Sequence, residues 1–205
     1  MTAYIDKIFE IEKLNLHLQV LLLINHLFNK PITNDMTAIY CSRKLETFIN
    51  TETIPEEINP YDREWSAHLV AIGGRKCVCM VDKKTLYGIL LIDVLKKDLP
   101  TISSTIYLSF IQQLKGDRIY NPELDGVYSR MFSSVRFFKT DNDRKSMGIL
   151  NGIIDNLKSY CNTREDKLEA ALYFARNTMN GIPFGTRKYK IAKEMMKTEM
   201  EEWLK

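Results

Sequence analysis

The sequence has few of the residues that build metal centres or disulfide frameworks. Its 205 residues include only four cysteines and three histidines. No two cysteines have the CxxC spacing, and His17 and His26 lie too far apart for the i, i+4 pairing of helical metal ligands. We therefore expect no metal and no cofactor. Cys77 and Cys79 would point to one face of a strand, where we expect them as small core residues.

A strong charge bias and a long apolar run are also missing. The net charge of +3 is too small to require a nucleic acid or an acidic membrane as partner, although local cation clusters leave a nucleic acid open. The most apolar stretch, residues 16–28, is short against the roughly 20 residues of a membrane span and contains polar side chains. Asp6, Glu10 and Glu12 stand where a signal peptide carries positive charge. We expect no membrane association and a reduced cytoplasm.

Helical periodicity dominates both ends of the chain. Residues 4–29 predict one long helix, or two meeting near Lys13, and its apolar surface would pack on the core or form a homodimer. Residues 164–179 predict a helix with an inward stripe, and residues 187–204 predict a final one. The inward residues would be Leu168, Leu172, Ala175 and Met179 in the first, and Ala192, Met196, Met200 and Trp203 in the second. Four cations open the final helix (Arg187, Lys188, Lys190 and Lys193), and a solvated face is favoured over contact with nucleic acid.

The middle of the chain mixes strand and helix patterns. Strands are predicted at residues 38–41, 65–72, 75–81 and 135–138, with Gly73 and Gly74 as a two-residue hairpin turn. The apolar run at 86–94 fits a buried strand or a helix, and a strand is favoured. Short helices are predicted at residues 43–49 and 99–114. The resulting fold class is α+β, an antiparallel sheet of four to five strands with flanking N- and C-terminal helices. We expect one domain over 1–205, with a core at 37–160 and helical additions at 1–36 and 161–205.

A candidate site lies where a strand meets a helix across a polar loop, within residues 137–160. Asp143 is the predicted N-cap of this helix. Arg144 and Lys145 follow it, and two cations in a first turn oppose the helix dipole. They are either balanced by Asp141 and Asp143 or present to receive an anion.

Gly148 and Gly152 stand four residues apart on the predicted helix, with Asn151 and Asp155 beside them. Each glycine costs about 1 kcal/mol relative to alanine in a helix interior. One explanation is a close crossing by another element, which we favour slightly. The other is a ligand or partner lying against a flat polar face.

Several of these residues resemble a bacterial family catalogued only as a domain of unknown function. The late segment contributes Thr140, Arg144, Gly148 and Asn151, and upstream matches are Trp65, Ala67, Leu69, Arg75, Lys76, Thr85 and Leu86. The resemblance covers about residues 37–160. It implies a fold unit and a bacterial or phage source, and it implies no activity. His68, Lys145 and Gly152 depart from the family pattern, so a polar site that depends on those positions is altered here.

The candidate ligand-binding residues are Thr140, Arg144, Lys145, Asn151, Trp65, His68 and Arg75. The favoured hypothesis is a non-enzymatic binding or regulatory module that holds an anionic group of a small molecule, a nucleic acid or a protein. A second is a hydrolase or transferase for a phosphate substrate, with Asp141, Asp143 or His68 as acid, base or metal ligand. A third is a structural protein that dimerises through its N-terminal helix. Tyr120 and Tyr128, near Arg118 and Arg130, offer a weaker nucleic-acid alternative by base stacking.

Overall fold

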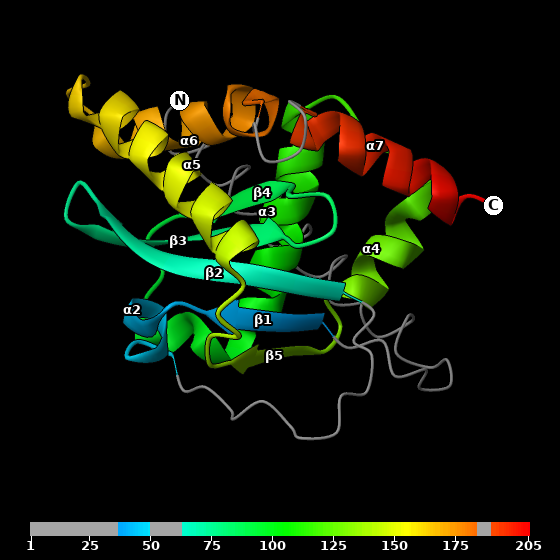
Figure 1. Ribbon diagram of the computed structural model, residues 1–205, viewed down its shortest axis with the longest axis horizontal. Helices are drawn as coiled ribbons and strands as arrows, with labels where there is room; N and C mark the ends of the chain where they lie inside the picture. Colours follow the sequence, from blue (N-terminus) through cyan, green and yellow to red (C-terminus); the bar gives the residue numbers. More distant parts are fainter. Residues whose placement is uncertain (1–36, 50–62, 184–189) are drawn as a thin grey trace, which may run out of the picture. The chain divides into compact units, whose positions relative to one another are not determined.

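The computed structural model describes residues 37–49, 63–183 and 190–205 (Figure 1). Every described element belongs to the second of the two units of the chain, Asn34–Lys205. The predictions for the helix at 4–29, its homodimer, and the cations Arg187 and Lys188 therefore lie outside the described residues. Within the described ranges, no helix is both long and apolar enough to cross a membrane.

A five-stranded sheet organises the second unit, in the order β4-β3-β2-β1-β5. The strands are β1 (Thr37–Cys41), β2 (Arg63–Ile72), β3 (Arg75–Asp82), β4 (Gly88–Leu91) and β5 (Val135–Phe138). β2, β3 and β4 pair antiparallel, whereas β1 runs parallel to both β2 and β5. The α+β class is confirmed, but the purely antiparallel sheet is wrong because the sheet is mixed. A short turn between two strands indicates in the sequence that they pair antiparallel. The long connections before and after β1 do not indicate its direction relative to its neighbours.

The β2–β3 hairpin forms as predicted. Ile72 pairs with Arg75, so Gly73 and Gly74 are the two loop residues. Both have positive φ, 56° and 77°, which is the conformation that a twisted two-residue hairpin requires and that glycine adopts most readily. This turn fixes the register of the two longest strands.

Helices cover both faces of the sheet (Figure 1). One face packs against α3 (Ile102–Gly116), α4 (Asp125–Met131) and α7 (Ala192–Trp203), through Trp65, Phe110, Tyr128 and Met196 among others. The other packs against α5 (Arg144–Asn162) and α6 (Lys167–Asn177). Short elements complete the unit: α2 (Arg43–Glu46) and the 3-10 turns η1 (Lys96–Thr101), η2 (Pro122–Leu124) and η3 (Met179–Gly181). Because successive side chains of a strand point to opposite faces of the sheet, neighbouring residues of β2 pack against different sets of helices.

The terminal helices were predicted with mixed success. The α7 stripe is confirmed, with Ala192, Met196 and Met200 buried. In α6 the prediction for Leu172 is wrong, since its side chain is exposed. The buried face of α6 is formed by Ala170, Ala171, Phe174 and Ala175, so the helix presents a rotated, mostly small-residue surface to the sheet.

Candidate functional site

The start of α5 is built by a network of side-chain to backbone hydrogen bonds. Asp143 caps the helix as predicted, accepting hydrogen bonds from the Lys145 amide at 3.0 Å and from the Ser146 hydroxyl at 2.6 Å. Burial alone would raise the pKa of Asp143, but these hydrogen bonds hold it below its ordinary value. Asp141 accepts in turn from the Asp143 amide. The protein's own carboxylate therefore serves the first-turn amides, so an anion here would have to be held by side chains.

Lys83 joins this loop to the sheet. Its ammonium group pairs with Asp141, lies 3.8 Å from Glu64, and sits 3.8 Å from the centre of the Tyr40 ring. The Tyr40 hydroxyl donates to Glu64 at 2.9 Å, and the Thr140 amide donates to Glu46 at 2.9 Å. Asp141 is thus neutralised by Lys83. The cations Arg144 and Lys145 are not needed for that role.

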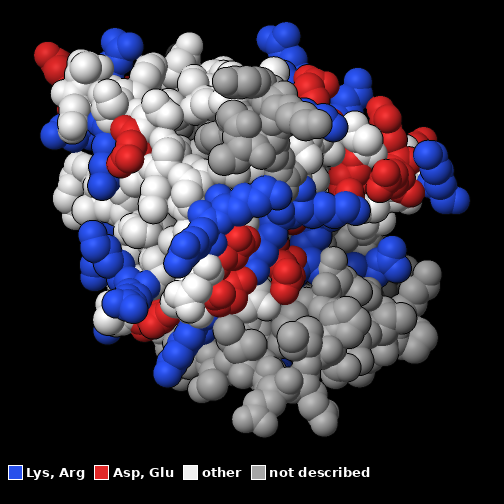
Figure 2. Space-filling view, viewed as in Figure 1, with Lys and Arg blue, Asp and Glu red and all other residues white. Residues whose placement is uncertain are grey.

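Beyond the cap, one face of α5 is open. Arg144, Lys145 and Asn151 are exposed, and their side chains form no hydrogen bond or ion pair with another described residue. A Cβ built on Gly148 or Gly152 would meet no atom of the described chain within 4 Å, so the close crossing that we had favoured is absent there. Figure 2 shows Lys and Arg side chains beside acidic ones over the region where α5 begins in Figure 1.

The other three predicted site residues lie elsewhere. Trp65 is fully buried on the opposite face of the sheet, edge-on to Phe110. His68 is half-buried on the α5 face, where burial, then the charges of Lys44 and Lys158, lower its pKa. Arg75 lies at the start of β3, at the opposite end of that strand from Lys83. The Arg75 guanidinium group pairs with Asp93 at 3.2 Å. Thr140 thus lies in the loop before α5 and Arg144, Lys145 and Asn151 lie on that helix, whereas Trp65, His68 and Arg75 lie on β2 and β3.

The residues considered for catalysis are largely engaged in structural contacts. Asp143 caps α5 and Asp141 pairs with Lys83. Among the described residues, no three His, Cys, Asp or Glu side chains are grouped to hold a metal ion. The base-stacking interpretation fails for Tyr128, which is fully buried in the core, and the Tyr120 hydroxyl donates to Asp125 at 2.7 Å.

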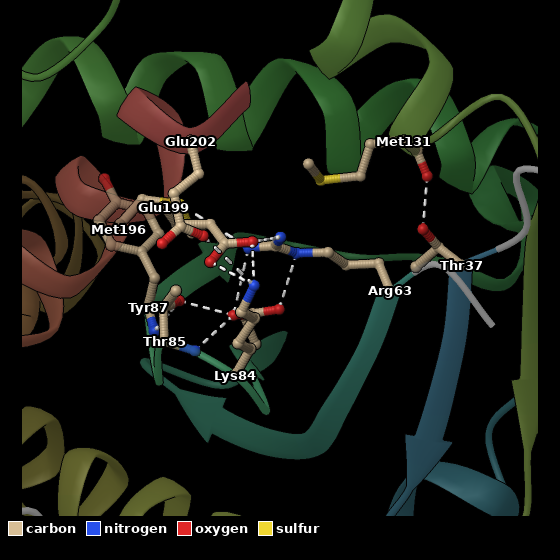
Figure 3. Close-up of polar contacts among 10 residues, drawn as sticks. Thr37, Arg63, Lys84, Thr85, Tyr87, Met131, Met196, Glu199 and Glu202 are labelled. Atoms are coloured by element: carbon tan, nitrogen blue, oxygen red, sulfur yellow. Dashed lines mark hydrogen bonds and ion pairs between the residues drawn. The ribbon is translucent and has the colours of Figure 1, made fainter. Parts of the chain in front are cut away.

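A second polar cluster, which the sequence analysis missed, is centred on Arg63 at the start of β2 (Figure 3). Its guanidinium group pairs with Asp82 at 2.9 Å and with Glu199 of α7 at 3.1 Å, and it lies 4.9 Å from the centre of the Trp203 ring. Lys84 pairs with Glu199 at 2.6 Å. Asp82 also accepts from the amide and hydroxyl of Thr85 at 2.7 and 2.6 Å. We call Arg63, Asp82, Lys84 and Glu199 the Arg63 cluster.

The Arg63 cluster is electrically balanced, and three of its four residues are buried. Arg63, Asp82 and Glu199 are each buried, whereas Lys84 is exposed, and the two cations are matched to two anions. Burial alone would raise the pKa of Glu199, but hydrogen bonds and charges from Lys84 and Arg63 hold it below its ordinary value. The signal in the sequence was Glu199 itself, an acid within the apolar stripe between Met196 and Met200. A charge on a buried face requires a buried partner. Beside the cluster lies a cavity of about 560 Å³.

Comparisons with known proteins identify a family but no characterised relative. No curated protein and no solved structure matches the chain. One family does match, over residues 38–195, which includes α6 and the first turn of α7 in addition to the region expected from the resemblance. The family carries no assigned activity, and its match spans well over half of the sequence. The chain belongs to the domain of unknown function family DUF6933.

Proposed function

We propose that this protein is a non-enzymatic binding module that accepts an anionic group on the exposed face at the start of α5. The observation that carries the proposal is a pair of adjacent, exposed cations, Arg144 and Lys145, whose side chains bond to no other described residue. Thr140 and Asn151 would contribute polar contacts at the two ends of the surface. Gly148 and Gly152 leave space for a ligand to approach the helix closely.

Physical chemistry supports a ligand of negative charge. Two cations in the first turn of a helix are unfavourable by about 0.3–1 kcal/mol each, because they face the positive end of the dipole. A bound anion would offset that cost. Since Asp143 already accepts from the first-turn amides, the ligand would be held mainly by Arg144 and Lys145. Such exposed contacts are screened by salt, so binding should weaken as ionic strength rises.

The test compares two double variants with the same change in charge. Arg144→Ala with Lys145→Ala removes the two cations of the proposed site. Lys96→Ala with Lys97→Ala removes two exposed cations that are consecutive in the sequence of η1. Fluorescence anisotropy with a labelled single-stranded oligonucleotide and competition by inorganic polyphosphate report binding of anionic groups. We expect the first variant to lose binding and the second to retain it. Equal affinity in both variants and the wild type would contradict the proposal.

We further propose a bacterial, cytoplasmic setting. The four cysteines are free thiols and all are buried, which fits a reducing compartment. Dimerisation through the helix predicted at residues 4–29 stays a prediction. A charged substitution at Leu21 or Leu22 should split such a dimer in analytical ultracentrifugation.

A further inference from the structure

The cavity beside the Arg63 cluster lies between the β3–β4 turn and α7. Its volume of about 560 Å³ is within the range of about 300–1,000 Å³ typical of small-molecule sites. Lys84 and Thr85 line it from the turn, and Lys190, Ile191, Glu194 and Met195 line it from α7 and the residues just before that helix. It is separate from the exposed face of α5, which shares none of these residues.

The charged group on the turn side of the cavity, Lys84, is already paired with a carboxylate of α7. Lys84 pairs with Glu199, and Glu199 also pairs with Arg63. The Thr85 hydroxyl donates to Asp82 and accepts from the Tyr87 amide at 3.2 Å. The charge of Lys84 is thus balanced by Glu199, so this wall favours neither a net cation nor a net anion as occupant.

The α7 side of the cavity offers one charge of each sign. The side chains of Lys190 and Glu194 form no hydrogen bond or ion pair with another described residue. Lys190 precedes the N-cap of α7, so the two side chains are not held at the i, i+4 spacing of a helical ion pair. Ile191 and Met195, both half-buried, alternate with them and supply apolar surface. Ile191 is also the N-cap of α7 and has no polar side chain to cap it.

We infer that this cavity binds a small zwitterion that carries an amino group and a carboxylate, of the kind presented by a free amino acid or a short peptide. The ligand carboxylate pairs with Lys190, and the ligand ammonium group pairs with Glu194. The apolar part of the ligand packs on Ile191 and Met195. A molecule of no net charge suits a cavity whose lining holds equal numbers of lysine and glutamate residues, Lys84 and Lys190 against Glu194 and Glu199.

The experiment titrates the full-length protein with each of the twenty free L-amino acids and with dialanine and dileucine, using isothermal titration calorimetry. The ligand that binds best is then compared with its N-acetyl and its C-terminal amide forms. We expect saturable binding of the zwitterion and a loss of about tenfold or more for each blocked form, because each lacks one charge-assisted contact. Failure of the whole panel to bind, or equal binding of the blocked forms, overturns the inference.

Matched variants locate the site. Lys190→Gln should weaken binding of the zwitterion and abolish the preference over the C-terminal amide, and Glu194→Gln should do the same for the N-acetyl form. Lys197→Gln and Glu201→Gln are the controls, because they remove the same charges from exposed residues of α7 that do not line the cavity. Unchanged binding in the Lys190 and Glu194 variants overturns the assignment. Arg144→Ala with Lys145→Ala should leave zwitterion binding intact, so this inference and the proposed anion site fail independently.

Discussion

The start of α5 and the Arg63 cluster use the same kinds of charged side chains in opposite ways. At α5 the residues are close in sequence, and Arg144 and Lys145 are exposed without a described partner. In the Arg63 cluster they come from β2, β3, the β3–β4 turn and α7 (Figure 3), and Arg63, Asp82 and Glu199 are buried and paired, with exposed Lys84 also bound to Glu199. Exposed, unmatched charge is available to a ligand. Buried, matched charge holds secondary-structure elements together.

The largest expected effect tests the structural half of this comparison. Replacing Arg63 with alanine leaves Asp82 and Glu199 buried without their guanidinium partner. Breaking a buried ion pair in this way costs about 3–5 kcal/mol, so the free energy of unfolding should fall by that amount in a urea titration. Arg43→Ala, at an exposed cation of α2, is the control and should change it by less than about 0.5 kcal/mol. A small effect of Arg63→Ala would mean that α7 is held by its apolar stripe alone.

The second largest expected effect is a loss of the stability that the Arg63 cluster provides as the pH falls. The pKa of Glu199 is lowered in the folded protein, so the unfolded state takes up a proton first as the pH falls. The stabilisation is therefore present above the ordinary glutamate pKa of about 4.3 and is lost as the pH drops through the lower folded value. Glu199→Gln should flatten this part of the stability curve, measured as the free energy of unfolding between about pH 6 and pH 3.

The matched control for the acid series is Glu201→Gln, an exposed acid on the same helix. It should leave the pH dependence as in the wild type. If Glu199→Gln leaves the pH dependence of the free energy of unfolding unchanged, the Glu199 carboxylate has the same pKa in the folded and unfolded states. That result would contradict its contacts with Arg63 and Lys84.

The smallest expected effect concerns the glycines of α5. Gly148→Ala and Gly152→Ala should each stabilise the protein by about 0.5–1 kcal/mol, because alanine favours the helix and a Cβ meets no described atom there. The same substitutions should weaken polyanion binding if the ligand approaches the helix closely. Gly88→Ala is the contrasting variant, since its Cβ would lie 3.3 Å from the Met179 side chain. We expect this variant to have a lower melting temperature in thermal unfolding. Destabilisation by the α5 substitutions would contradict an open face.

Local features were predictable because neighbouring residues produce them. The Asp143 cap depends on a carboxylate just before a helix, and the hairpin depends on two glycines between alternating strands. Long-range features were not predictable in the same way. Trp65 and His68 point to opposite faces of β2, and the sequence did not show which helices would cover each face. Base stacking by Tyr128 was only a weaker alternative, because an aromatic residue beside arginines fits a surface and a core equally well.

The sequence by itself determined the α+β class, the hairpin, the cap of α5 and the cation pair that follows it, because short-range steric and hydrogen-bonding preferences specify each of these. Only the tertiary structure decided that β1 runs parallel to its neighbours and that Leu172 faces outward. It also decided that Arg63 meets Glu199, 136 residues away. Such contacts depend on how whole elements pack: the apolar stripe around Glu199 indicates a buried charge, but the sequence does not say which distant residue will pair with it.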